Sequence, residues 1–195
     1  MALLDFQVRD ELNPRVRVGD VELRRPRIDH HDAWAALRRE SRAHLTRWEP
    51  DWRDDDLSLP AFKDLLRGYG RAARAGLAAP FFVFREDDDA FLGGVNLVNV
   101  TRGATQSASI GYWIGAPYTR QGYGVQAVEG ALSFAFGTLA LNRVEAACQP
   151  ENVASRDLLS KAGFRHEGYA RDYLHINGAW RDHLLFAVLA SDLRR

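Results

Sequence analysis

The sequence predicts a single α/β domain of the α+β kind, with one mixed, mostly antiparallel central sheet and about four helices. Two observations carry this prediction. Segments with alternating apolar residues are interspersed with segments whose apolar residues recur every three or four positions, which is the pattern of strands interleaved with helices. In addition, the pair Asn177-Gly178 separates the last two strand patterns and is typical of a β-hairpin turn.

The composition is that of one globular domain over residues 1–195, with an irregular lead-in over residues 1–20. Hydrophobic residues make up 46% and charged residues 27% of the chain, which are ordinary values for globular proteins. Lys plus Arg (26) balance Asp plus Glu (26). Because the net charge is zero, it favours no membrane surface, and direct binding to nucleic acid is not expected.

Targeting and redox features point to a cytoplasmic protein. The N-terminus lacks the basic region and apolar core of a signal peptide, and no stretch approaches the ~20 apolar residues of a membrane span. Cys148 is the only cysteine, so an internal disulfide is excluded and a reducing compartment is favoured. It lies in the apolar run 144–148, where a buried strand thiol is expected rather than a reactive one.

The N-terminal half is expected to hold a strand followed by two helices. The strand covers residues 21–25, and Asp29 or Asp32 is expected to cap the first helix. The acidic segment 54–56 reads as a solvated linker, and a second helix is expected over residues 60–76. The apolar positions expected on the buried sides of the two helices are Trp34, Leu37, Leu45, Phe62, Leu65, Leu66 and Tyr69.

Strands and helices alternate along the rest of the chain. Strands are expected at 81–85, 91–100, 107–114, 144–149, 164–173 and 179–189, with helices at 125–139 and just before Gly163. Tyr112 and Trp113 fall on opposite faces of their strand, so only one of them is expected to line a site.

The stretch 118–125 joins the strand over 107–114 to the following helix. Gly122 and Gly124 lack a Cβ, so the backbone can turn tightly and approach a ligand closely. The first N–H groups of a helix have no partner within it, and the helix dipole adds about half a positive charge at that end. These features predict a phosphate cradle with Arg120 at its mouth. The alternative is a glycine turn required by sterics alone.

This loop resembles the pyrophosphate-binding loop of the GCN5-related N-acetyltransferases (GNATs), whose pattern is Q/R-x-x-G-x-G/A. Thr119 stands at the first position of that pattern in place of Gln or Arg. The segment 152–164 reads N-V-A-S-R-D-L-L-S-K-A-G-F and resembles the N-x-x-S…K-x-G-F element of the same family. The segments that resemble the RimJ branch of this family are 45–50, 111–115, 167–174 and 177–183.

The resemblance implies the GNAT fold, acetyl-CoA as acetyl donor, and a protein N-terminus as acceptor, namely the N-terminal alanine of ribosomal small-subunit protein five. The cofactor-binding residues that it implies are Trp113, Ile114, Arg120, Gln121, Gly122, Tyr123, Gly124, Val125, Asn152 and Arg156. The substrate-binding residues expected with it are Trp48, Asn96 and Tyr173.

Two of these assignments have a structural alternative. The side chain of Asn152 is expected to reach the pantetheine arm of coenzyme A, but an Asn at this position is also a typical helix N-cap. The aromatic segment with Trp48 and Trp52 suits the wall of a binding cleft. It would equally suit a hydrophobic plug beneath a loop.

The catalytic residues are less evident than the cofactor loop. Many GNATs carry a Glu where Ser109 stands and a Tyr acid where Leu159 stands, and this chain has neither. Ser155 is therefore the candidate to hydrogen-bond or protonate the leaving thiolate, with a plain helix-start hydroxyl as the alternative. A backbone N–H near Trp113 or Ile114, where the strand would separate from its neighbour, is expected to meet the thioester carbonyl.

Glu49 is the candidate catalytic carboxylate on the amine side, with Glu167 and Asp172 as further candidates. An α-amine has a pKa near 7.7 to 8.0, so freeing it at pH 7 costs only about 1 kcal/mol, against roughly 4 to 5 kcal/mol for a lysine amine. An N-terminal substrate thus demands little of a general base.

No positioned cysteine or serine–histidine pair suggests an acyl-enzyme, so direct attack in a ternary complex is expected. The alternatives are an acetyltransferase for a small amine such as an antibiotic or polyamine, and a non-catalytic acyl-CoA-binding module. No metal site is expected because no His pair has ligand spacing. The protein would be a monomer or a homodimer.

Overall fold

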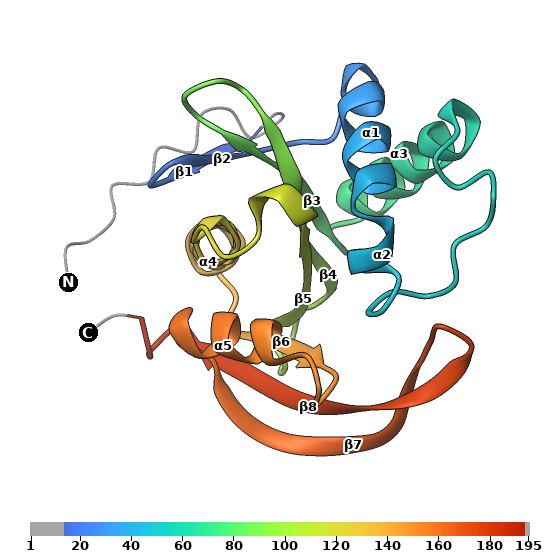
Figure 1. Ribbon diagram of the computed structural model, residues 1–195. Helices are drawn as coiled ribbons and strands as arrows, with labels where there is room; N and C mark the ends of the chain where they lie inside the picture. Colours follow the sequence, from blue (N-terminus) through green and yellow to red (C-terminus); the bar gives the residue numbers. More distant parts are fainter. Residues whose placement is uncertain (1–13, 194–195) are drawn as a thin grey trace.

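An eight-stranded sheet with helices on both faces forms the part of the chain that the computed structural model describes, residues 14–193 (Figure 1). The strands are β1 (Arg15–Val18), β2 (Val21–Arg24), β3 (Ala79–Arg85), β4 (Phe91–Thr101), β5 (Ser107–Ile114), β6 (Arg143–Cys148), β7 (Arg165–Ile176) and β8 (Ala179–Leu189). Their order is β1-β2-β3-β4-β5-β6-β8-β7, and only the β5–β6 pair is parallel. The predicted mixed, mostly antiparallel sheet is confirmed.

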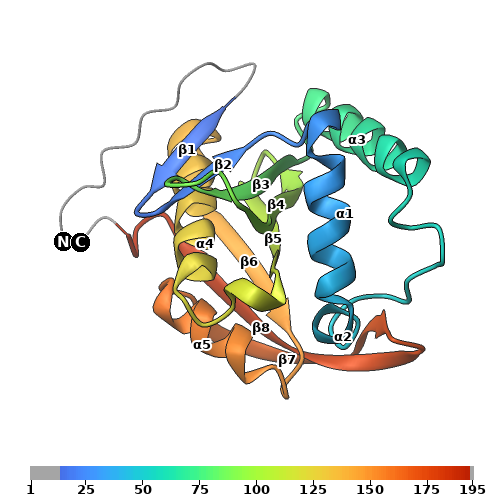
Figure 2. The same ribbon diagram turned by 45° about the horizontal axis from the view of Figure 1, so that its top comes forward.

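Helices cover the two faces of this sheet in separate groups, as Figure 2 shows. One face carries α1 (His31–Glu40), α2 (Arg42–Leu45) and α3 (Leu59–Arg74), and the other carries α4 (Tyr123–Ser133) and α5 (Val153–Lys161). The expectation of about four helices is thus close to the five observed. No helix within residues 14–193 is both long and apolar enough to cross a membrane.

Each face has its own apolar core. The larger core lies under α4 and α5 and includes Leu23, Val95 and Val128, all fully buried. The smaller core lies under α1 and α3, where Trp34 packs against Phe62 with ring centroids 4.8 Å apart. The predicted buried side of the second helix is therefore correct, and it explains why α3 lies across the sheet rather than in solvent.

The start of the chain differs from the prediction. Residues 15–18 were expected in an irregular lead-in but form β1, in which Val16 and Val18 are buried and alternate with the exposed Arg15 and Arg17. Alternation of buried and exposed residues indicates a strand, but over only four residues the signal is weak. The rest of the predicted lead-in, residues 1–13, lies outside the described residues.

Two predicted helices also differ in detail. The first divides at Ser41 into α1 and α2, and neither Asp29 nor Asp32 caps it, because Asp29 lies in a preceding 3-10 turn and pairs with Arg27. The helix predicted over 125–139 starts at Tyr123 and ends as one π-helical turn over Phe134–Thr138. Apolar periodicity does not distinguish an α-helical turn from a π turn.

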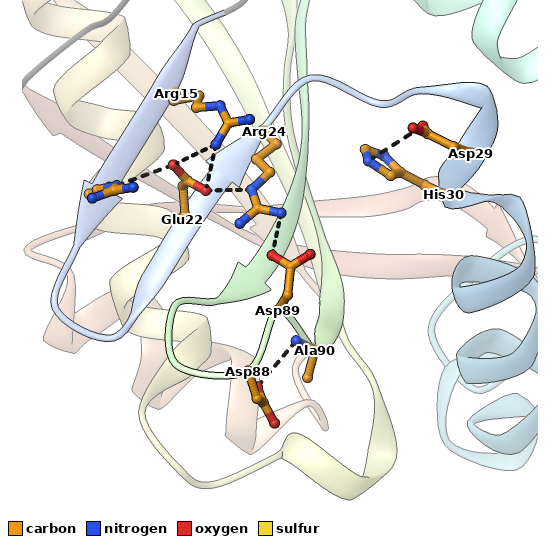
Figure 3. A network of polar contacts seen from close by, with 9 residues as sticks. Arg15, Glu22, Arg24, Asp29, His30, Asp88, Asp89 and Ala90 are labelled. Atoms are coloured by element: carbon orange, nitrogen blue, oxygen red, sulfur yellow. Dashed lines mark hydrogen bonds and ion pairs between the residues drawn. The ribbon is translucent and has the colours of Figure 1, made fainter.

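A buried carboxylate ties the first strands together (Figure 3). Glu22 on β2 is only 1% exposed and pairs with Arg15, Arg17 and Arg24 from the same two strands. Burial alone would raise the pKa of this carboxyl, but the hydrogen bonds from Arg24 and Arg17 outweigh it, so the pKa lies below its usual value. Arg24 in turn reaches Asp89 in the β3–β4 turn. The network therefore links β1 and β2 to the β3–β4 turn.

Replacing Glu22 with Gln is expected to lower the free energy of unfolding at pH 7 by about 2 kcal/mol, since hydrogen bonds to a charged group are lost. The folded-state pKa is depressed, so the stabilisation is present above the unfolded pKa of about 4.3 and is lost as the pH falls through the folded pKa. Urea unfolding at pH 7 and pH 3 measures both effects. Glu86→Gln, which removes the exposed partner of Arg17, is the control and should cost at most about 0.5 kcal/mol. Equal losses in the two variants would contradict the prediction.

Candidate active site

The parallel strands β5 and β6 separate partway along their length. Pairing joins Ser107–Ser109 to Arg143–Glu145 and then stops, although β5 continues to Ile114 and β6 to Cys148. Beyond this point β5 remains paired with β4 alone, through Gly93. The separation expected beside Trp113 and Ile114 is therefore present, and it opens the sheet between the carboxyl ends of two parallel strands, where ligands commonly bind in α/β folds.

The loop after β5 presents a row of free backbone donors at this opening. A 3-10 turn (Ala116–Tyr118) leads into the loop, and Gly122, with φ +89°, is the N-cap of α4. Within the described chain, the N–H groups of residues 120–124 have no protein acceptor. They lie at the N-terminus of α4, where the helix dipole favours an anion. The geometry therefore fits the predicted pyrophosphate cradle.

Contacts within the protein hold this loop in place. The Gln121 amide donates to the carbonyl of Pro117 at 2.9 Å, so Gln121 braces the loop from inside. The N–H of Ala116 donates to the hydroxyl of Ser41 at 2.8 Å, which links the loop to the α1–α2 junction on the opposite face. A preformed loop loses little conformational entropy when it binds a ligand.

The two loop glycines have different roles. A Cβ at Gly124 would lie 2.7 Å from Leu158 Cδ1 and 3.5 Å from Ile114 Cγ1, so this glycine allows α4 to pack closely against α5 and β5. A Cβ at Gly122 would find its nearest neighbour at 3.9 Å, on Gln126. The sterics-only alternative thus describes Gly124, whereas Gly122 is required by its positive φ in an open position.

The start of α5 borders the same opening. Asn152 caps this helix, because its Oδ1 accepts from the N–H of Ser155 at 3.1 Å. Its amide NH₂ has no protein partner within the described residues, so capping leaves donors free for a ligand. Arg156 donates to the carbonyl of Pro150 at 3.2 Å. Ser155 Oγ lies 2.7 Å from the hydroxyl of Tyr112 on β5.

Tyr112 and Trp113 lie on opposite faces of β5, as predicted, and of the two only Trp113 is among the residues that line a pocket. Tyr112 packs on the α4 face and reaches α5, while Trp113 lines a pocket on the α1–α3 face. Adjacent residues of one strand therefore border both halves of the site.

The pocket on the α1–α3 face has a volume of about 430 Å³, which suits a small ligand or the end of a peptide. The sheet forms its floor, α1 and α3 form two walls, and the segment around Trp52 forms a third. Its lining residues are Trp34, Arg38, Trp52, Arg53, Asp56, Leu57, Ala61, Asp64, Leu65, Tyr69, Phe82, Gly94, Asn96 and Trp113.

Arg38 organises one wall of this pocket. Its guanidinium carbon lies 4.3 Å from the ring centre of Trp52, 5.0 Å from that of Trp113 and 5.7 Å from that of Trp34. The same guanidinium pairs with both carboxylate oxygens of Glu49, at 3.3 and 2.5 Å, and Trp52 Nε1 donates to Glu49 at 2.8 Å. Both oxygens of Glu49 are thus committed, which suits a positioning role for this carboxylate and not the predicted role of a base.

Asn96 and Tyr69 form a polar pair in the pocket floor. The Asn96 amide donates to the Tyr69 hydroxyl at 3.1 Å, and burial raises the pKa of Tyr69 although this hydrogen bond opposes it. The Asn96 Oδ1 is buried without any partner. An unpaired buried acceptor costs about 1 to 3 kcal/mol, and a donor from a bound ligand would remove that cost. The structure thus places the predicted substrate residue Asn96 in the pocket.

Comparison with known proteins identifies the family. A family model described as an acetyltransferase (GNAT) domain matches residues 20–165. The chain belongs to the GNAT acetyltransferase family. It is accordingly an acyltransferase, and its acetyl donor is acetyl-CoA, whose diphosphate matches the free N–H groups at the start of α4.

The similarity to individual proteins covers most of the chain. A curated relative from Escherichia coli (strain K12), the [ribosomal protein uS5]-alanine N-acetyltransferase, is 35% identical over 92% of this chain and 93% of its own length. The structure of Mycobacterium smegmatis RimJ in complex with CoA-disulfide superposes with a TM-score of 0.86 at 36% identity, covering 94% of this chain and 89% of that one. The ribosomal-protein-S5-alanine acetyltransferase from Vibrio fischeri superposes with a TM-score of 0.84 at 28% identity, covering 93% of this chain and 99% of that one.

Several residues singled out in the sequence lie outside the pocket of this GNAT. Trp48 does not line the pocket, and its ring contacts the guanidinium of Arg47. Trp52 forms that part of the pocket wall instead. Tyr173 lies on the β7–β8 hairpin, 47% exposed, where its ring contacts His183. The carboxylate candidate Glu167 pairs with Arg143 at the surface.

The structure shows what surrounds the two positions at which many GNATs carry a catalytic Glu and a catalytic Tyr. Leu159 is a fully buried core residue, and Ser109 lies where β5 still pairs with β6. Asp172, the remaining carboxylate candidate, is exposed on β7 and is not among the residues that line the pocket. Within residues 14–193 no cluster of three or more His, Cys, Asp or Glu side chains could hold a metal ion.

Sequence reasoning did not place Arg38 or Asp56 at the site, placed Tyr69 only on the buried side of the second helix, and named Tyr112 only as the alternative to Trp113. The spacing of Trp34 and Arg38, four residues apart on one helix face, was a signal for Arg38, because such residues are neighbours. Asp56 was assigned to a solvated linker, yet it lines the pocket and pairs with Arg53 at 3.0 Å. No local signal predicts the partners of Tyr69 and Tyr112, which are Asn96 and Ser155, since these partners are distant in the sequence.

Proposed function

We propose that this GNAT transfers the acetyl group of acetyl-CoA to the α-amine of the N-terminal alanine of ribosomal protein uS5, by direct attack in a ternary complex. The observation that carries this assignment is the 35% identity to the E. coli uS5-alanine N-acetyltransferase over 92% of this chain and 93% of that protein. Full-length similarity at this level covers both the donor side and the acceptor side of the site.

The arrangement around β5 supports direct attack. The cradle and Ser155 border the opening between β5 and β6, and the pocket lies on the other face of β5, where Trp113 forms part of its wall. Only the backbone of β5 separates the opening from the pocket. An acetyl group held at the opening would therefore lie close to an amine held in the pocket. No residue between the two sites needs to carry the acetyl group.

The charges of the pocket support an acceptor amine of low pKa. Its two carboxylates, Asp56 and Asp64, pair with Arg53 and Arg67 respectively, so neither is a free base. At pH 7 an α-amine loses its proton at a cost of about 1 kcal/mol, whereas a lysine amine requires roughly 4 to 5 kcal/mol. A site without an unpaired carboxylate therefore suits a protein N-terminus better than a lysine or a polyamine.

The roles proposed for individual residues follow from their positions. The N–H groups of residues 120–124 and the side chain of Arg120 would hold the diphosphate, and the free amide NH₂ of Asn152 would hold the pantetheine arm. A backbone N–H at Trp113 or Ile114 would meet the thioester carbonyl. Asn96 would accept a hydrogen bond from the acceptor amine, while Trp48 and Tyr173 are proposed to contact the acceptor outside the pocket.

The test is a thiol-release assay with mass detection on a peptide that carries the N-terminus of uS5, Ala first, and one internal lysine. The same peptide with a blocked N-terminus and a panel of polyamines serve as controls. Acetylation confined to the free α-amine is the expected result. Turnover on the polyamines alone would identify a small-molecule acetyltransferase and overturn the proposed acceptor.

A further inference from the structure

Tyr112 and Ser155 meet across the opening between the two parallel strands. Tyr112 lies on β5, Ser155 lies in the first turn of α5, and their hydroxyl oxygens are 2.7 Å apart. The Tyr112 hydroxyl is also 3.5 Å from the backbone carbonyl oxygen of Ser155. No other residue within the described chain hydrogen-bonds the Tyr112 hydroxyl. The pair thus forms an isolated polar contact in largely apolar surroundings.

The geometry favours Tyr112 as the donor in this contact, because its only other acceptor within the described residues, the Ser155 carbonyl oxygen, lies 3.5 Å away. Tyr112 packs against the main apolar core, and burial raises the pKa of its hydroxyl well above the usual value. A phenol in such surroundings stays protonated, because a buried phenolate would be poorly solvated, so its hydrogen needs an acceptor. Ser155 Oγ then accepts from Tyr112, and the serine hydrogen has to point elsewhere.

The other neighbours of Ser155 limit where that hydrogen can point. The N–H of Ser155 is already used by the Asn152 cap, so the backbone of this turn is fixed. The buried thiol of Cys148, at the end of β6, adjoins the same hydroxyl. Burial raises the pKa of Cys148, and the contact with Ser155 opposes this effect. Cys148 and the opening between the strands are therefore two directions in which the serine hydroxyl can point.

We propose that Tyr112 is a positioning residue that, by donating to Ser155 Oγ, directs the serine hydrogen toward the sulfur of coenzyme A in the opening between β5 and β6. The proposal rests on the proposed acetyl transfer. In that reaction the amine nitrogen bonds to the carbonyl carbon, the carbon–sulfur bond breaks, and the electron pair goes to sulfur. The proton lost by the amine balances the one gained by the thiolate, so Ser155 and Tyr112 keep theirs.

This assignment explains how a serine can serve where the family commonly has a tyrosine. A serine hydroxyl is a poor acid, but it needs only to donate a hydrogen bond to the negative charge that develops on sulfur. A hydroxyl oriented beforehand stabilises that charge more than one free to rotate, because no reorganisation is needed during the reaction. Without Tyr112, the Ser155 hydroxyl could turn to its own surroundings, including Cys148.

The test compares the binding of coenzyme A with that of desulfo-coenzyme A, which lacks the sulfur, by calorimetry at pH 7 and pH 9.5. A free thiol has a pKa of about 8.5, so the sulfur is largely ionised at the higher pH. The wild type is expected to prefer coenzyme A at pH 9.5 by about tenfold, because a hydrogen bond to a charged group is gained. Tyr112→Phe and Ser155→Ala should each reduce this preference to below about threefold, while the affinity for desulfo-coenzyme A stays the same.

Turnover provides the second measurement. Tyr112→Phe is expected to lower kcat by about tenfold with little change in the KM for acetyl-CoA, and adding it to Ser155→Ala should cause no further loss. Tyr169→Phe is the matched control, because it removes a tyrosine hydroxyl that bonds Asp182 on the hairpin. A contact that merely docks α5 would change the melting temperature and leave the coenzyme A preference intact, and that outcome would overturn the proposal. The binding ratio needs no acceptor, so it is independent of whether uS5 is the substrate.

Discussion

Gly122→Ala is expected to raise the KM for acetyl-CoA by about 30-fold, equivalent to roughly 2 kcal/mol, with a much smaller change in kcat. Gly122 has φ +89°, lies at the N-cap of α4 and belongs to the run of free N–H groups over residues 120–124. A methyl group at this position would project from the cradle itself, since a Cβ there meets no side chain closer than 3.9 Å. It would also favour a backbone rotation that turns the N–H groups away from the ligand.

Gly103→Ala is the control for backbone strain. Gly103 has a comparable φ of +72°, and a Cβ at that position would meet nothing within 4 Å. Both variants should lose about 1 kcal/mol of stability, because each forces alanine into the left-handed region. Only Gly122→Ala should weaken binding of acetyl-CoA, measured as KM and by calorimetry. Equal KM values for the two variants would show that Gly122 serves the turn alone.

Arg38→Lys is expected to raise the KM for the acceptor by about tenfold or more while leaving the KM for acetyl-CoA unchanged. Lysine keeps the positive charge but loses the bidentate pairing with Glu49 and the flat surface that stacks between Trp52 and Trp113. Glu49 would then lose the partner that fixes it, and with it the Trp52 N–H contact. The pocket wall would relax, and the acceptor would bind with poorer fit.

Arg42→Lys is the control for this variant. Arg42 also lies over the Trp52 ring, at 5.6 Å, but it is exposed and is not among the residues that line the pocket. Its replacement should change the acceptor KM less than about twofold, since an exposed stacking contact contributes little. Steady-state kinetics with both substrates varied separate the two effects. A rise in the KM for acetyl-CoA in Arg38→Lys would contradict the assignment of this wall to the acceptor.

Gly122→Ala and Arg38→Lys together test whether β5 separates a donor side of the site, for acetyl-CoA, from an acceptor side. The first is expected to act on the donor side alone and the second on the acceptor side alone. A hydrogen bond from the Ala116 N–H to the Ser41 hydroxyl links the two sides, because it joins the loop after β5 to the α1–α2 junction. Neither variant removes this bond, so each is expected to leave the other side in place.

The sequence by itself determined the order of the elements, the cofactor loop, the Asn152 helix start and the closing hairpin. These features depend on local properties: apolar periodicity, a glycine at a helix N-cap, a capping side chain, and the Asn177-Gly178 turn, whose two residues both have positive φ. Even the short strand β1 carries its alternation in four residues. Neighbouring residues are sufficient to specify such features, because their interactions span only a few positions.

Only the tertiary structure decided which side chains meet at the site. The Tyr112–Ser155 contact joins residues 43 positions apart, and the Asn96–Tyr69 contact joins residues 27 apart. Glu49 could be read as a base until Arg38 was seen to occupy both of its oxygens. Such contacts depend on the strand order and on the point where β5 leaves β6, and neither is encoded in a local pattern. The physical reason is that long-range contacts result from the packing of the whole sheet and its helices, whereas periodicity reports only which face of an element is buried.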